Sequence, residues 1–416
     1  MSERAAILAG SAALRCAAAL VGLASVLAPG CSCEAPRADA GQAPVEDAAS
    51  RPDSASLPDA GHAEDSGSGP DRDGATPDGA PADAAPDDGA SPDRSGPDAS
   101  HSIYGIFGWS AGAAAAIMSG KQGFSVEFLR SEVEWADSGW WNSRMNDYAA
   151  MIAEGFTPIT RLSYGPSMMP ADPALCDGTG GDDFAQRAAA MAVAIRDRHG
   201  AVARRFIVGN EPNHPAEGEL DVADYARCYL QVYQKIKAAW PAAVVMPAAV
   251  APWAPKDYDC QGNSACTGLG QPWLRYYFGL VLAVGAAADA YDMHTYGGRD
   301  GDRDPYDDGN SSFGAFEVAL AANNAAYPNH KPVYITEFNN GANGNAYSYD
   351  GSWAGFVQAA YRRVNDYNSQ AGAGRVRSLC WFTYDLAGWE FFNLTSHDQA
   401  RSDFQWTTAN TSYRAP

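Results

Sequence analysis

Two glutamates lie where short apolar runs give way to polar loops. Glu211 follows the apolar run 206–208 in "RRFIVGNEP", and Glu337 comes directly after "VYIT". Two facing carboxyls, one protonated and one ionised, are what hydrolysis of a glycosidic bond requires. Each also has a simpler interpretation: Glu211 as a solvated acid before Pro212, and Glu337 as a cap of the segment that follows. Which interpretation holds depends on whether the fold brings the two glutamates together.

The elements that must position these glutamates alternate along the chain from residue 102. Eight apolar or aromatic runs are typical of strands: 102–109, 124–135, 156–165, 204–212, 242–253, 290–298, 332–340 and 378–385. Longer amphipathic stretches separate them, and this alternation predicts an α/β fold, the (β/α)8 TIM barrel. A doubly wound open sheet is the alternative, but no Gly-rich phosphate loop follows the first run.

Two of the intervening stretches carry clear helix signals. In "DYARCYLQVYQKIKAAW" the residues expected on one buried face are Tyr225, Tyr229, Val232, Ile236 and Trp240. Asp182 and Asp183 stand where N-cap acids belong before "FAQRAAAMAVAIRDRHG", and Gly200 is expected to end that helix.

Barrel enzymes carry their catalytic groups at the C-terminal ends of the strands. Besides Glu211 and Glu337, the polar and aromatic residues at these ends are Arg130, Asn210, His294, Tyr296 and Trp381. The two glutamates end the fourth and seventh strands, so a barrel would place them across one mouth.

Asn-Glu-Pro at strand 4 and Thr-Glu-Phe at strand 7 resemble the clan A glycoside hydrolases, over most of residues 102–400. The resemblance implies that Glu211 is the acid/base and Glu337 the nucleophile of a retaining mechanism. It implies that Asn210 hydrogen-bonds the sugar 2-hydroxyl.

The same resemblance assigns supporting roles to four further residues. Arg130 would support the nucleophile, and Tyr296 would bond it, with His294 beside Tyr296 on the sixth strand. Trp381 would form the aromatic floor under the sugar. The simpler alternatives are a surface ion pair for Arg130 and core packing for the other three.

The resemblance leaves the substrate open among cellulose-, mannan- and xylan-like β-glycans. A non-catalytic carbohydrate-binding barrel exposed at the cell surface is the alternative from another class, and remodelling of host or self glycans is a third interpretation. We expect no cofactor and no metal site, because no Cys or His spacing resembles one. The acidic segment 298–310 lacks the spacing of a calcium loop and is expected to be solvated.

The N-terminal part of the chain differs from the rest in its charge and its amino-acid composition. Every Phe, Trp and Tyr lies from residue 104 onward, and residues 1–100 hold 17 acidic and 6 basic side chains, so about half of the net charge of −21 belongs to this part. We expect residues 1–31 to be a signal peptide of lipoprotein type, 32–101 a disordered Ala/Asp/Pro/Gly-rich linker, and 102–416 the hydrolase domain. The acidic balance argues against nucleic acid or anionic lipid as a partner.

We expect an exported, monomeric bacterial protein that is either a cell-surface lipoprotein or secreted. Cys31 ends a lipobox-like "LAPGC" and is the expected lipid site, the only predicted link to a membrane. Cys260 and Cys266 are close enough in sequence to close a small loop, Cys176 and Cys228 are a possible second pair, and Cys380 is expected to be a buried thiol.

Overall fold

The computed structural model describes residues 102–165, 168–170, 173–176, 179, 183–297, 313–328, 330–340, 354–370 and 376–416. The expected signal peptide 1–31, the linker 32–101 and the acidic segment 298–310 lie outside the described residues. The sixth predicted strand, 290–298, is described up to residue 297. Within the described part, no helix combines the length and the apolar character needed to cross a bilayer.

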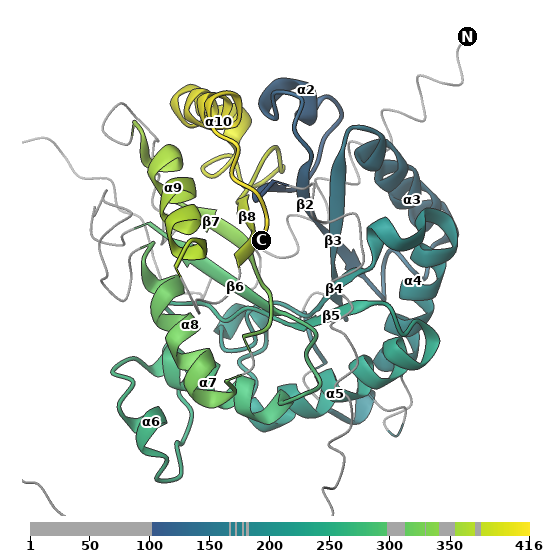
Figure 1. The fold of residues 1–416 in the computed structure, drawn as a ribbon. Helices are drawn as coiled ribbons and strands as arrows, with labels where there is room; N and C mark the ends of the chain where they lie inside the picture. The colour runs from purple at the N-terminus through teal and green to yellow at the C-terminus, as the bar shows by residue number, and fades with distance from the viewer. Residues whose placement is uncertain are drawn as a thin grey trace, which may run out of the picture. The chain divides into compact units, whose positions relative to one another are not determined.

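Eight parallel strands form a nearly closed barrel, which confirms the predicted (β/α)8 fold (Figure 1). The strands are β1 (Tyr104–Phe107), β2 (Gly123–Arg130), β3 (Phe156–Ser163), β4 (Arg205–Val208), β5 (Val244–Pro247), β6 (Tyr291–Tyr296), β7 (Val333–Asn339) and β8 (Val376–Trp381). Their hydrogen-bonded order is β5-β4-β3-β2-β1-β8-β7-β6.

Side chains and one backbone bond close the seam between β5 and β6. The Asp289 amide donates to the Val245 carbonyl (3.0 Å), and the Val245 amide donates to the Asp289 carboxylate (2.9 Å). One layer higher, the Ala249 amide donates to Asp292 (3.2 Å). The barrel therefore closes without a regular ladder at this point.

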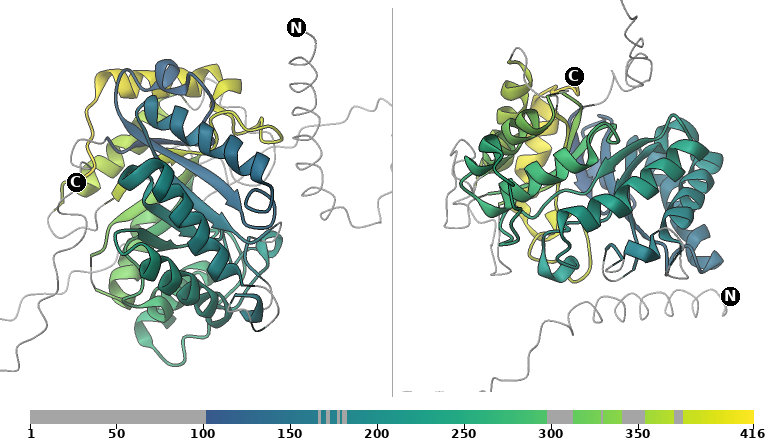
Figure 2. Two further views of the ribbon diagram at one scale, coloured as in Figure 1. Left: turned by 90° about the vertical axis from the view of Figure 1, so that its right-hand side faces the viewer. Right: turned by 90° about the horizontal axis from the view of Figure 1, so that it is seen from below.

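Helices follow the strands and surround the barrel, as the two side views also show (Figure 2). They are α2 (Ala113–Ile117), α3 (Ser138–Ala153), α4 (Phe184–His199), α5 (Val222–Ala239), α6 (Ser264–Thr267), α7 (Pro272–Val284), α8 (Ala315–Ala326), α9 (Phe356–Asn368) and α10 (Asp398–Asn410). Short 3-10 turns are η3 (Pro173–Leu175), η4 (Gly200–Ala203), η5 (Pro215–Glu217) and η7 (Leu394–Ser396).

Both helices that the sequence predicts are present, as α5 and α4. The predicted apolar face of α5 is buried against the barrel, from Tyr225 to Ile236. Asp183 caps α4 by accepting the Gln186 amide (2.7 Å), and α4 ends at His199, immediately before Gly200. Asp182 lies outside the described residues.

Two disulfides hold loops around the barrel. Cys176 is bonded to Cys228 of α5, and Cys260 is bonded to Cys266, so both pairings considered from the sequence are confirmed. Cys380 is a buried free thiol, also as expected.

Candidate active site

Strand β6 points three functional side chains into the barrel. Alternate residues of a strand share one face, so Asp292, His294 and Tyr296 line the interior together. All three are buried. Asp292 lies deepest, and Tyr296 lies at the C-terminal end of the strand, where barrel enzymes do their chemistry.

Strand β7 brings Glu337 beside His294. The pairing of the two strands shifts between Met293 and His294, so that Met293 lies opposite Ile335 but His294 lies opposite Glu337. This irregularity allows the adjacent residues Thr336 and Glu337 both to reach interior partners. Phe338, next in sequence, points outward and packs against helix α9.

Arg161 of β3 is the positive centre of the site. Its side chain is buried, and its guanidinium donates to Glu337 Oε1 (2.6 Å) and to Thr336 Oγ1 (3.2 Å). It also lies over the ring of Phe107, at 5.2 Å from the ring centre. Thr336 in turn donates to Asp292 (2.6 Å), which fixes the hydroxyl that Arg161 contacts.

Arg130, predicted to support Glu337, lies elsewhere. Its guanidinium pairs with Glu134 (3.0 Å), and its side chain remains 23% exposed. Residue 130 ends β2, and the loop that follows offers Glu134 four residues later, so the ion pair forms locally. Arg161 takes the predicted role of Arg130, which the sequence analysis therefore assigned wrongly.

A strained loop delivers Glu211 into the same space. Gly209 adopts a φ of 83°, and a Cβ placed there would lie 2.6 Å from Met169 Cγ. Glu211 itself has a φ of 32°, which residues with a side chain rarely adopt. Such strain tends to persist where surrounding structure enforces it, often at functional sites.

Asn213 holds this loop in place. Its side chain exchanges two hydrogen bonds with the backbone of Ala251 (2.8 and 3.0 Å), and it is fully buried. The Glu211 carbonyl accepts the amide of His214 (2.8 Å). The position of Glu211 is thus fixed through the β5 loop as well as through β4.

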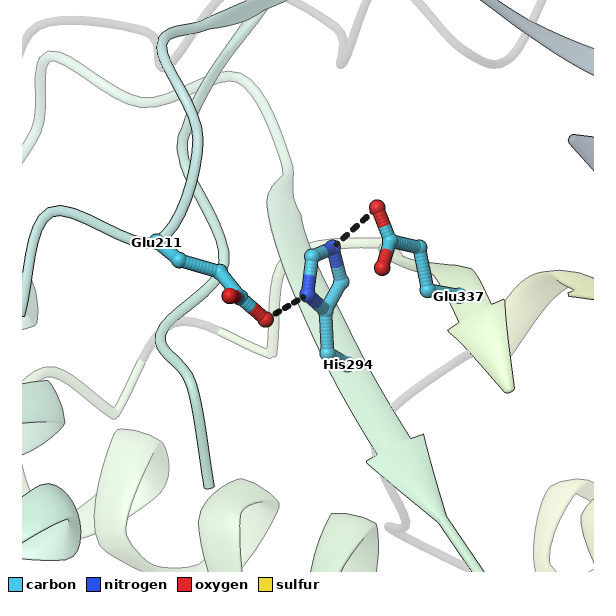
Figure 3. A group of neighbouring side chains, drawn as sticks. All are labelled: Glu211, His294 and Glu337. Carbon is cyan, nitrogen blue, oxygen red and sulfur yellow. Dashed lines mark hydrogen bonds and ion pairs between the residues drawn. The ribbon is translucent and has the colours of Figure 1, made fainter. Parts of the chain in front are cut away.

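His294 lies between the two glutamates (Figure 3). Its Nδ1 is 2.7 Å from Glu211 Oε1, and its Nε2 is 3.4 Å from Glu337 Oε1. A carboxylate oxygen of Glu211, one of Glu337 and a ring nitrogen of His294 all lie within 4.8 Å of one another. The structure therefore brings together the two predicted carboxyls.

The environment of Glu337 favours its ionised form. Burial raises the pKa of this carboxyl, but His294, Arg161 and the Tyr296 hydroxyl together outweigh burial and hold the pKa below its usual value. The Tyr296 hydroxyl donates to Glu337 Oε2 (2.5 Å), so the predicted hydrogen bond is present. Burial, and then Glu337, keep the pKa of Tyr296 well above its usual value, so it remains a donor.

The tautomer of His294 follows from its neighbours. An arginine has only donors, so in the neutral ring the contact between Arg161 and Nε2 (3.1 Å) favours the tautomer with an unprotonated Nε2. The ring proton is therefore on Nδ1 and faces Glu211. Burial lowers the pKa of His294, but Glu337 and Glu211 outweigh it and raise the pKa above its usual value.

The donor set of Glu211, His294 and Glu337 would in principle suit a metal ion. A cation there would stand beside the Arg161 guanidinium, which already bonds Glu337 Oε1 at 2.6 Å. The imidazole nitrogens are engaged by Glu211 and Arg161. The positive charge of Arg161 and the engaged ring nitrogens disfavour a bound cation, so the arrangement is better suited to proton transfer by the carboxyls.

Trp381, predicted as the aromatic floor, does not line the site. It is fully buried, its ring packs against the outward Phe338 (5.3 Å), and its Nε1 donates to the Phe392 carbonyl (3.0 Å). The next residue, Phe382, faces Tyr296 instead, with ring centres 6.4 Å apart. The sequence prediction was wrong by one residue, which reverses the face of a strand.

Asn210 is buried beside Glu211, where the sequence analysis placed it. The residues that sequence reasoning missed are Arg161, Asp292, Thr336 and Phe382. A usable signal existed for the first two, because a lone charged residue inside an otherwise buried strand needs a partner.

The chain matches a known protein family. A family model described as glycosyl hydrolase catalytic core matches residues 176–399. None of the curated proteins matches the chain.

Similar solved structures have low sequence identity. They include a glucosidase from Croceicoccus marinus (13% identity, TM-score 0.49, covering 74% of this chain and 68% of that one). A monomeric β-xylosidase from Caulobacter crescentus CB15 has 18% identity and a TM-score of 0.49, covering 76% and 69%. An exo-β-1,4-mannosidase from Opitutaceae bacterium strain TAV5 has 15% identity and a TM-score of 0.49, covering 75% and 60%.

Proposed function

The chain belongs to the glycosyl hydrolase catalytic core family, and on that premise we propose that it cleaves β-glycosidic bonds in a β-glycan with retention of configuration. Glu337 is the nucleophile in this proposal, and Glu211 is the acid/base. The polymer is cellulose-, mannan- or xylan-like.

The observation that carries the proposal is the close approach of two carboxyls in different surroundings. One oxygen of Glu211 and one of Glu337 lie within 4.8 Å of each other, which is near the carboxyl separation of about 5–5.5 Å in retaining enzymes and below the roughly 6.5–9.5 Å of inverting ones. Arg161 and Tyr296 hold Glu337 ionised. We propose that Glu211 carries its proton on Oε2, because His294 Nδ1 lies 2.7 Å from Oε1.

The first step forms a bond between a Glu337 oxygen and the anomeric carbon. The bond from that carbon to the leaving oxygen breaks, and this oxygen takes the proton of Glu211. Glu337 thereby becomes a neutral ester beside Arg161 and Tyr296, and Glu211, which has given up its proton, is left as the negatively charged carboxylate.

The second step reverses these roles. Water attacks the anomeric carbon, Glu211 takes the proton from water, and Glu337 leaves as a carboxylate. Asn210 would bond the sugar 2-hydroxyl in both steps, as the resemblance implies. The rings of Tyr296, Phe382 and Trp253 offer apolar faces for the sugar, with Trp253 5.0 Å from Tyr296.

A panel of aryl β-glucosides, β-mannosides and β-xylosides, together with the corresponding polymers, tests this proposal. Glu211→Gln should lose about 10²- to 10⁴-fold in kcat on poor leaving groups, because proton donation contributes that much. It should lose far less on dinitrophenyl glycosides, whose leaving group needs no proton. Glu337→Gln should lose activity on both, and the exposed Glu219→Gln is the matched control.

The alternative is a barrel that binds carbohydrate without cleaving it. Glycan binding by the wild type with no hydrolysis of any substrate in the panel would favour that alternative. Activity that survives both Glu211→Gln and Glu337→Gln would overturn the assignment of the site.

A further inference from the structure

A third carboxyl lies close to the catalytic pair. Glu217 ends the 3-10 turn η5, six residues after Glu211, and its amide donates to the His214 carbonyl (3.0 Å). Gly218 follows with a φ of 114°, so the chain turns back at this point. Asn210 hydrogen-bonds the Glu217 carboxyl, and Glu211, Arg161 and Glu337 are close enough to act on it electrostatically.

Two buried oxygens beside the catalytic acid have unused hydrogen-bonding capacity. Among the residues that the structure describes, Glu217 Oε2 and Asn210 Oδ1 are buried and make no hydrogen bond. Buried polar atoms of folded proteins are almost always hydrogen-bonded, because leaving one without a partner forfeits its hydration with no compensating bond. The Asn210 amide nitrogen faces Glu217, so its oxygen is the atom left for another molecule.

The chemistry of these two oxygens complements a hydroxyl group. A hydroxyl donates one hydrogen bond and accepts others, so it needs an acceptor and a donor side by side. Asn210 Oδ1 can only accept, and a protonated carboxyl supplies a donor. Burial is the first cause that raises the pKa of Glu217 to about 8, and Glu211 adds to it whenever Glu211 is ionised, so the Glu217 carboxyl is protonated at neutral pH.

We propose that Glu217 is a substrate-binding residue that, together with Asn210, holds the 2-hydroxyl of the sugar whose bond is cleaved. This inference rests on the proposed function. Glu217 orients the Asn210 amide through one oxygen and donates to the sugar hydroxyl through the other. The carboxyl thereby selects sugars that carry a hydroxyl at this position.

The charges around Glu217 give the contact a pH dependence. Glu211 comes from the same loop, Glu337 from β7 and Arg161 from β3; of these charges only Arg161 favours the ionised form, and the hydrogen bond from Asn210 favours it as well. When the pH rises through about 8, Glu217 loses its proton. The donor to the sugar disappears, and a negative charge is added beside two other glutamates.

The test uses dinitrophenyl β-glycosides and the variants Glu217→Gln, Glu217→Ala and Glu219→Gln. The activated leaving group removes the need for the Glu211 proton, so the alkaline limb of kcat/KM reports other groups. The wild type and Glu219→Gln should lose kcat/KM as the pH rises through about 8. Glu217→Gln keeps a donor and an acceptor but cannot ionise, so it should retain activity and lose this limb.

The second readout is the sugar hydroxyl itself. Glu217→Ala should lower kcat/KM by about 10- to 100-fold, the loss expected for one buried hydrogen-bonding group. The rate ratio between a glycoside and its 2-deoxy analogue should fall in Glu217→Ala relative to the wild type, because the contact has already been lost. A fold defect alone would leave that ratio unchanged.

Several results would overturn the inference. One is an active wild type whose alkaline limb and 2-deoxy ratio are unaffected by both Glu217 variants. If the wild type hydrolyses no glycoside, the proposed function fails separately, and binding of cellobiose, xylobiose and mannobiose is then followed by tryptophan fluorescence. Weaker binding in Glu217→Ala than in Glu219→Gln supports the contact, whereas equal binding or none in the wild type contradicts it.

Discussion

At the scale of single residues, the chemistry depends on one buried arginine. Arg161 is the only arginine or lysine within hydrogen-bonding distance of Glu337 among the described residues, and it also contacts His294 and Thr336. A buried carboxylate without such a partner would take up a proton and lose its nucleophilicity. Together with His294 and Tyr296, Arg161 therefore favours the ionised form of Glu337 that the proposed first step needs.

Arg161→Lys tests this role, with Arg130→Lys as the matched control. Lysine keeps the charge but cannot bond Glu337, His294 and Thr336 together, so kcat/KM should fall by about 100-fold or more. The hydrogen bond from Arg161 lowers the pKa of Glu337 in addition to the charge, so weakening that bond in Arg161→Lys should raise this pKa, and the acid limb of the pH profile should move to higher pH. Arg130→Lys should leave the limb in place, and the reverse pattern would contradict the assignment.

At the scale of elements, the loop after β4 is built to hold Glu211 in an unfavourable conformation. Gly209→Ala should destabilise the protein in two ways: through the left-handed backbone, at about 1–2 kcal/mol, and through collision with Met169. Gly112→Ala is the control, since Gly112 has a φ of 87° but open space around it.

Melting temperature and kcat/KM measured together separate these effects. Both variants should melt at lower temperature, but Gly209→Ala should also lose activity, because Glu211 lies two residues away. Full activity in a folded Gly209→Ala variant would mean that the loop does not position Glu211 in the way described.

The strands and four of the site residues could be predicted from the sequence, whereas the orientation of others could not. The eight strands followed from apolar runs bounded by loops, and Glu211, Glu337, His294 and Tyr296 followed from their places at strand ends. Trp381 and Phe382 are both large aromatics, so nothing in the local pattern told which one faces inward. Arg130 was predicted because it ends its strand, whereas Arg161 reaches the site from the strand interior.

At the scale of the whole molecule, two disulfides differ in the length of chain that they close. Cys176–Cys228 spans 52 residues and Cys260–Cys266 spans 6. Chain entropy then predicts losses of about 4 and about 2 kcal/mol when each pair is replaced by serines. Denaturant titration of the two double variants measures this, and a larger loss for the short loop would contradict the prediction.

We propose that the N-terminal part exports the protein and anchors it through a lipid on Cys31. Cys33, two residues later, provides a matched control. Labelled palmitate fed to bacteria that express the full chain should appear in the wild type and in Cys33→Ser but not in Cys31→Ser. A label that persists in Cys31→Ser, or that is absent from the wild type, would refute the anchor.

The most direct measurement of the catalytic account is covalent trapping. Dinitrophenyl 2-deoxy-2-fluoro-β-glycosides of glucose, mannose and xylose slow the second step more than the formation of the intermediate, so the glycosyl group accumulates on the nucleophile. Mass spectrometry of the digested protein should place one added glycosyl group on Glu337, and Glu337→Gln should acquire none. A label on another residue, or none on a protein that hydrolyses the parent glycoside, would contradict the double-displacement mechanism proposed for this barrel.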